Sequence, residues 1–142
     1  MLKTGGYINI LIAVGHLAGL IWSDQVFELF GINRQMNALS QIHSSLPYLL
    51  TILVSLVFFS FGLYGLSGAG KIKRMPLLNP VIFFIGGIYL FRGLGELIYE
   101  TTRTTHSIAE ITYSSIALAI GLLYLIGGLE KWRANRIEVA NT

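Results

Sequence analysis

The sequence contains no cysteine among its 142 residues. Disulfides, thiolate metal sites, iron–sulfur clusters and cysteine nucleophiles are therefore excluded. Charge is also scarce, since 12% of the residues are Asp, Glu, Lys or Arg whereas 54% are hydrophobic. With a mean hydropathy of +0.66, the chain has too little polar surface to coat a water-soluble domain of this size. The composition predicts an integral membrane protein in contact with a lipid bilayer.

Four long apolar stretches account for this composition, at about 5–22, 46–66, 76–99 and 108–129. A membrane-spanning helix needs about 20 residues, so each stretch is long enough to cross a bilayer. Bulky residues, IWSDQVFELF, follow the first stretch where a signal-peptide cleavage site requires small ones, so we expect it to be a retained span. We predict an all-α membrane protein in which residues 1–142 form one domain, an up-and-down bundle of four transmembrane helices.

The connections carry signals for helix ends. The segment GLSGAGKIKRMP at 65–76 predicts a tight hairpin, with Pro76 near the first turn of the next helix. The segment TTRTTHS at 101–107 offers Ser107 or Thr105 as the N-cap of the last helix. The longer connection at 23–45 has apolar residues at roughly helical spacing, which predicts an interfacial helical segment between the first two spans.

Basic residues are distributed unevenly between the two ends of the predicted spans. Cytoplasmic segments of membrane proteins carry the excess of Lys and Arg, so both termini are predicted to be cytoplasmic. The net charge of +3 then reflects topology and contact with anionic lipid, and nucleic-acid binding is not expected. The predicted cytoplasmic side holds Lys3, Lys71, Lys73, Arg74, Lys131, Arg133 and Arg136, and the other side holds Arg34 and Arg103.

The third apolar stretch contains unexpected charges, in the sequence YLFRGLGELIYE at 89–100. Arg92 precedes Tyr99 by about two helical turns, which places it about 10 Å inside the outer boundary of the membrane. A charge near the bilayer centre costs about 2.5–3.5 kcal/mol, so these side chains are expected to face the bundle interior and to pair. At about 100° per residue, one stripe of this helix collects Tyr89, Arg92, Glu96, Tyr99 and Arg103.

Polar residues of the other spans gather at the same outer level. His16 and Asn9 share a stripe of the first span, and Glu110 stands at the start of the fourth. Ionisable residues inside a membrane indicate a functional site by default. We therefore predict an outward-facing site for an ion or small ligand. Its residues are Arg92, Glu96, Glu100, His16, Glu110, Tyr89 and Asn9.

Structural interpretations of the same residues remain open. Arg92 and Glu96, four residues apart, have the spacing of a pair that neutralises itself and joins helices. His16 alone is typical of a hydrogen-bonding residue between helices, and His43 and His106 of solvated or capping histidines. The glycines, including the G-x-x-x-G of GHLAG at 15–19, indicate close helix packing.

Three classes of function follow from this pattern. The first is binding or conduction of a small ion, a proton or a polar or anionic molecule, by a homo-oligomer or with a membrane-protein partner, because one four-helix bundle encloses little space. The second is a haem- or metal-binding redox protein with His43, His106 and His16 as ligands. The third is a non-catalytic accessory or scaffold subunit. An enzyme is the least favoured class, because no Ser–His–acid set is indicated.

Four short spans, glycine-rich packing and the R-G-x-G element in LFRGLGE at 90–96 together resemble the small DoxX-like membrane proteins of bacteria. In that family the arginine typically belongs to an earlier span. The resemblance implies a four-span protein of the bacterial inner membrane with a non-hydrolytic role. It implies nothing about the identity of the ligand.

Overall fold

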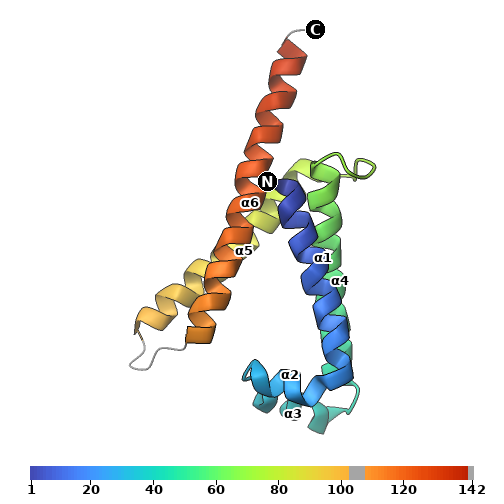
Figure 1. The fold of residues 1–142 in the computed structure, drawn as a ribbon, viewed down its shortest axis with the longest axis vertical. Coiled ribbons are helices and arrows are strands. Elements are labelled where there is room, and N and C mark those ends of the chain that lie inside the picture. The colour runs from blue at the N-terminus through green and yellow to red at the C-terminus, as the bar shows by residue number, and fades with distance from the viewer. Residues whose placement is uncertain (103–107, 141–142) are drawn as a thin grey trace. The chain divides into compact units, whose positions relative to one another are not determined.

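The computed structural model describes residues 1–102 and 108–140, without the side chains of residues 135 and 137–140, and all its regular secondary structure is helical (Figure 1). The helices are α1 (Leu2–Gly19), the 3-10 turn η1 (Leu20–Trp22), α2 (Ser23–Leu29), α3 (Asn33–Ile42), α4 (Leu46–Gly68), α5 (Leu78–Thr102) and α6 (Ile108–Ala140).

Four helical runs are long and apolar enough to cross a membrane: Leu2–Leu29, Leu46–Gly68, Leu78–Thr102 and Ile108–Ala134. The prediction of an all-α protein with four transmembrane helices is confirmed. The first run is longer than predicted, because η1 and α2 continue the helical path beyond Trp22.

The start of the third span differs from the prediction. Pro76 lies in the connection and not in the first turn of α5, because the next residue, Leu77, has a φ of +52° that no α-helix accommodates. The proline within the first turn of α5 is Pro80. A proline has no backbone N–H, and in the first turn of a helix that group would have no partner within the helix.

The chain divides into two compact units, and each has its own packing. The first unit, Met1–Ile8 with Leu63–Thr142, contains the start of α1, the end of α4, and helices α5 and α6. The second unit, Asn9–Gly62, contains the rest of α1, the short helices η1, α2 and α3, and most of α4.

Helices α5 and α6 of the first unit lie side by side and antiparallel (Figure 1). Glycines permit their close approach. A methyl group added at Gly93 would lie 2.7 Å from Cγ of Leu118 and 2.9 Å from the carbonyl oxygen of Ser114. A methyl group at Gly121 would lie 3.0 Å from Cδ2 of Leu90. Small residues at such positions let membrane helices gain van der Waals contact, which replaces the hydrophobic driving force that lipid removes.

Tyr124 of α6 joins three helices of the first unit. The residue is fully buried. A methyl group at Gly5 of α1 would lie 2.8 Å from the Tyr124 ring, and one at Gly65 of α4 would lie 2.6 Å from its hydroxyl oxygen and 2.7 Å from Cα of Gly6. The start of α1 and the end of α4 carry glycines at this point and therefore form a notch. The tyrosine fills this notch.

The connection between α4 and α5 is the short hairpin that the sequence predicts, and hydrogen bonds fix both of its arms. The Ser67 hydroxyl donates to the carbonyl oxygen of Lys73 at 3.1 Å and accepts from the N–H of Met75 at 2.9 Å. Nζ of Lys131, on α6, donates to the carbonyl oxygen of Gly68 at 2.9 Å. The C-terminus of α4 is thus capped by a cation, which also suits the negative end of the helix dipole.

Contacts between α1 and α4 build the second unit. The Ser55 hydroxyl donates to the carbonyl oxygen of Ala13 at 2.8 Å, and the rings of His16 and Phe58 lie 5.2 Å apart. Gly31, with a φ of +66°, separates α2 from α3. The predicted helical segment between the first two spans therefore consists of two short helices.

We predict that Gly93→Ala destabilises the protein whereas Gly95→Ala does not. Both positions lie in α5 and gain the same helix propensity, about 1 kcal/mol. A methyl group at Gly95 meets nothing within 4 Å, but one at Gly93 meets the backbone of α6, and overpacking of this kind costs about 1–3 kcal/mol. Thermal unfolding in mild detergent measures the difference. Equal midpoints for the two variants would contradict the close packing of α5 on α6.

Candidate functional site

Polar residues lie along the contact between α5 and α6, in the half of this hairpin nearer to its connection at 103–107. Tyr89 and Glu100 of α5 are buried, with only 2% of Glu100 exposed, and Ser114 of α6 is fully buried. Glu96 and Glu110 are half-buried. We call these five residues, Tyr89, Glu96, Glu100, Glu110 and Ser114, the polar seam.

Helical spacing explains why these residues share the seam. On α5, steps of three or four residues connect Tyr89, Gly93, Glu96 and Glu100, and on α6 the same steps connect Glu110 to Ser114 and onward to Tyr124. Such steps keep side chains on one face of a helix. The stripe on α5 continues into apolar residues, Ile82 and Ile85, at the other end of the helix, so only one half of the contact is polar.

Arg92 lies at the flank of the polar seam. Its Nη2 is 3.2 Å from Oε2 of Glu96, which confirms the ion pair expected from the spacing of the two residues. The side chain of Arg92 is 60% exposed and that of Glu96 is 31% exposed. A guanidinium carries five N–H donors, and the Arg92 side chain is largely exposed. It can therefore bind a second anionic group without leaving Glu96.

The predicted stripe of five residues divides in the structure. At about 100° per residue, Arg92 and Tyr99 are turned about 60–80° from Tyr89, whereas Glu96 and Glu100 are turned by about 20°. Tyr89 is accordingly buried, whereas Tyr99 is exposed. Arg103, the last member of the stripe, lies outside the described residues.

The two glutamates nearest the end of the hairpin are held in different ways. Glu100 belongs to the last turn of α5 and is buried. Glu110 belongs to the first turn of α6, where a negative charge interacts favourably with the helix dipole. Both residues have interaction partners. The expected N-caps of α6, Ser107 and Thr105, lie outside the described residues.

Ser114 is the residue of the polar seam that the sequence prediction left out of the site. Its hydroxyl oxygen is buried and has no hydrogen-bond partner among the described residues. Buried hydroxyl groups are normally satisfied, so this one has room for a partner such as a water molecule or an ion. The sequence pattern that could have identified Ser114 is its position one turn after Glu110, on the same face of α6.

His16 and Asn9 belong to the second unit. The Nδ1 of His16 lies 2.8 Å from the carbonyl oxygen of Ile12, one turn earlier in the same helix, and its ring packs on Phe58. Asn9 is fully buried and has an interaction partner. The contacts of His16 give it a structural role inside its unit. The participation of His16 and Asn9 in one site with Arg92 stays a prediction from the sequence.

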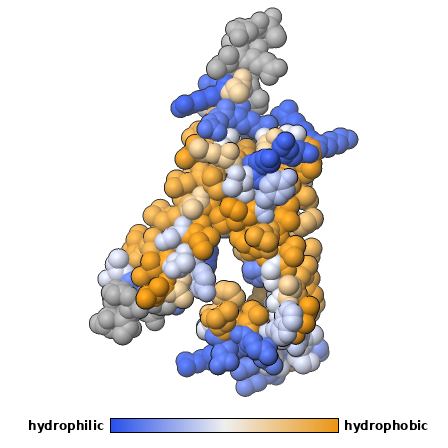
Figure 2. Space-filling model, viewed as in Figure 1, coloured by the Kyte–Doolittle hydropathy of each residue, from blue (hydrophilic) through white to orange (hydrophobic). Residues whose placement is uncertain are grey.

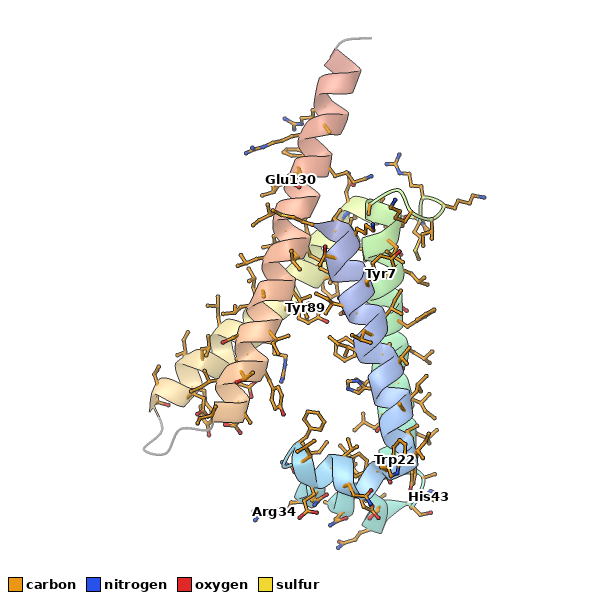
Figure 3. The ribbon with its side chains drawn as sticks, viewed as in Figure 1. Tyr7, Trp22, Arg34, His43, Tyr89 and Glu130 are labelled. Atoms are coloured by element: carbon orange, nitrogen blue, oxygen red, sulfur yellow. The ribbon has the colours of Figure 1, made fainter. Side chains whose placement is uncertain are left out.

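His43 ends α3 and takes part in the turn that leads into α4 (Figure 3). The backbone N–H of Ser45 donates to Nδ1 of His43 at 3.3 Å, and the Ser45 hydroxyl lies 2.7 Å from the same atom. His106 lies outside the described residues. Over residues 1–102 and 108–140, no three His, Asp or Glu side chains are grouped as a metal ion requires. The haem or metal interpretation therefore stays a prediction.

The four apolar spans define the class of protein: a multi-pass integral membrane protein. Comparison with known proteins finds no family model, no curated protein and no solved structure that matches the chain.

We predict that Ser114→Ala leaves the stability of the detergent-solubilised protein unchanged or raises it, because the change removes a buried hydroxyl without breaking a described hydrogen bond. The matched control is Ser55→Ala, which removes the hydrogen bond to Ala13 between α4 and α1 and is expected to cost about 0.6 kcal/mol. The measurement is chemical unfolding of both variants in the same detergent. A larger loss for Ser114→Ala than for Ser55→Ala would show that its hydroxyl has a structural partner.

Proposed function

We propose that the protein binds or conducts a small ion, a proton or a small polar or anionic molecule, at a site formed by the polar seam and Arg92. The single observation that carries this proposal is the burial of Glu100, with 2% exposure, beside a half-exposed Arg92–Glu96 ion pair in a helix that spans the membrane. Carboxylates buried in such helices are rare, and they mark ion paths, proton relays and ligand sites.

The position of the charges within α5 supports the proposal. Arg92 precedes the end of α5 at Thr102 by about 15 Å at 1.5 Å per residue, so it lies well inside the span. An unpaired charge at the bilayer centre costs about 2.5–3.5 kcal/mol. The ion pair offsets part of this cost, yet a pair of leucines would avoid it entirely. Retaining two charges at this depth is therefore best explained by a ligand that needs them.

The chemistry of the residues gives each a proposed role. Arg92 attracts an anionic group, and Glu96 holds the guanidinium in place until that group arrives. Glu100 and Glu110 accept a proton or bind a cation, with the hydroxyls of Ser114 and Tyr89 as further ligands. Because polar residues are confined to one half of the α5–α6 contact, the site opens toward one side of the membrane only. Conduction across the whole membrane would need a homo-oligomer or a partner membrane protein.

By the distribution of Lys and Arg, this open side is the external one, and the chain ends are cytoplasmic in a bacterial inner membrane.

A reporter of topology tests this orientation. We expect a reporter enzyme that is active only in the cytoplasm to be active when fused after Thr142 or inserted in the hairpin at 68–75. The same reporter inserted at 31–37 is expected to be inactive, because that segment follows the first span. The opposite pattern of activities would place the polar seam at the cytoplasmic side.

Leucine substitutions at Arg92 and Glu96 test the site itself. We predict that Arg92→Leu alone destabilises the protein, because Glu96 is left without its cation. The loss is at most the insertion cost of a charge, about 2.5–3.5 kcal/mol. The double variant Arg92→Leu with Glu96→Leu is expected to recover the stability, since a pair and its desolvation nearly cancel. Unfolding in detergent measures both, and a double-mutant cycle isolates the coupling.

Activity separates a site from a structural ion pair. The wild-type protein and the double variant are reconstituted into vesicles that contain dyes for pH and for chloride, and entry of both ions is recorded under an imposed voltage. We expect the wild type to admit one of these ions and the folded double variant to have lost this flux. A folded double variant with the same flux as the wild type would show that Arg92 and Glu96 form only a structural ion pair.

A further inference from the structure

A shallow cavity of about 220 Å³ lies in the first unit, at the end where α1 begins and α4 ends. Its volume is below the roughly 300–1,000 Å³ of pockets for drug-sized ligands, so it suits a small group. All its lining residues belong to the first unit, and it lies at the opposite end of α6 from the polar seam. The lining includes Leu2, Lys3, Gly68, Gly127, Glu130 and Lys131.

The cavity carries an excess of positive charge. Lys3 and Lys131 line it together with one acid, Glu130. The hydrogen bond from Lys131 to Gly68 holds its ammonium group at the cavity wall. Helix α1 begins at Leu2, so the unpaired N–H groups of its first turn add the positive end of a helix dipole. These features favour an anion with several oxygen acceptors, such as a phosphate group.

The surroundings of the cavity match the membrane interface. Two membrane-spanning runs have an end at this level, since Leu2 begins the first run and Gly68 ends the second. Figure 2 shows hydrophilic residues at this end of the first unit, over the α4–α5 hairpin and the adjoining part of α6, with hydrophobic residues along the helices below them.

Exposed apolar residues continue from the cavity along α6. Leu122 and Ile126 are both exposed and precede Glu130 at intervals of four residues, so they form one stripe on the helix. A phospholipid whose phosphate occupies the cavity would lay an acyl chain along this stripe. A soluble anion would gain nothing from it.

We propose that this cavity binds the phosphate of an anionic phospholipid headgroup, with Lys3 and Lys131 as its cationic ligands. Glu130 opposes the binding of a negative headgroup and so limits its strength. The site is separate from the one proposed for ion or ligand binding, and neither depends on the other.

Thermal unfolding of the delipidated protein in a neutral detergent tests the choice of ligand. Phosphatidylglycerol is added in one series, phosphatidylcholine in a second and inorganic phosphate in a third. A ligand of the native state raises the unfolding midpoint with the logarithm of its concentration once that concentration exceeds the dissociation constant. We expect such a rise with phosphatidylglycerol only. An equal rise with phosphatidylcholine, or with inorganic phosphate, would overturn the proposal of an anionic lipid.

Two substitutions that each remove one positive charge distinguish lipid binding in the cavity from a general attraction of the lipid to basic residues. Lys3→Ala is expected to weaken the binding of phosphatidylglycerol about fivefold, the effect of about one basic residue near an anionic surface. The control Lys73→Ala removes the same charge from an exposed residue of the hairpin, outside the cavity, and is expected to leave the binding unchanged. Equal weakening by the two changes would show diffuse surface attraction and overturn the proposal.

Glu130→Gln provides a change in the opposite direction. Removing the carboxylate from the cavity is expected to strengthen the binding of phosphatidylglycerol about fivefold. A purely structural role of Glu130 would lower the unfolding midpoint without altering the dependence on lipid concentration. Tighter binding by this variant supports the assignment even where a lysine variant unfolds, and unchanged binding would contradict it.

Discussion

The close approach of helices across glycines is the constraint on which the first unit depends. Lipid is as apolar as leucine, so helices in a membrane associate through van der Waals contact and hydrogen bonds and not through the hydrophobic effect. Gly93 and Gly121 supply that contact between α5 and α6, and Gly5 and Gly65 supply it around Tyr124. With the helix backbones this close, α5 and α6 leave little space for solvent between them. Polar side chains of the seam must therefore find most of their hydrogen-bond partners within the protein itself.

The spans were predictable from the sequence because they depend on a property of composition. About 20 apolar residues suffice to cross a bilayer and can do so only as a helix, since every backbone hydrogen bond must be made within the segment. The ends of the spans were less predictable. Whether a helix begins at Pro76 or at Leu78 depends on the conformation of Leu77, and a positive φ at a leucine has no signature in the sequence.

The candidate site was predictable as a set of residues but not as an arrangement. Spacing shows that Arg92, Glu96 and Glu100 lie within one broad face of a helix. It does not show which residues of that face are buried against the neighbouring helix. In the structure Glu100 is buried, whereas Arg92 lies at the edge of the contact and is largely exposed. The cavity at the other end joins Lys3, Gly68 and Lys131. These residues are far apart in the sequence, and no local pattern connects them.

The notch around Tyr124 has a consequence for the order of assembly. Gly5 lies in the first of the four spans, whereas Tyr124 lies in the fourth. Because synthesis runs from the N-terminus, α1 leaves the ribosome before the residue that its first turns pack against. Contacts between residues so distant along the chain form late and slowly. The start of α1 therefore stays in the bilayer without its final neighbour until the fourth span has been made, and only then can the first unit close.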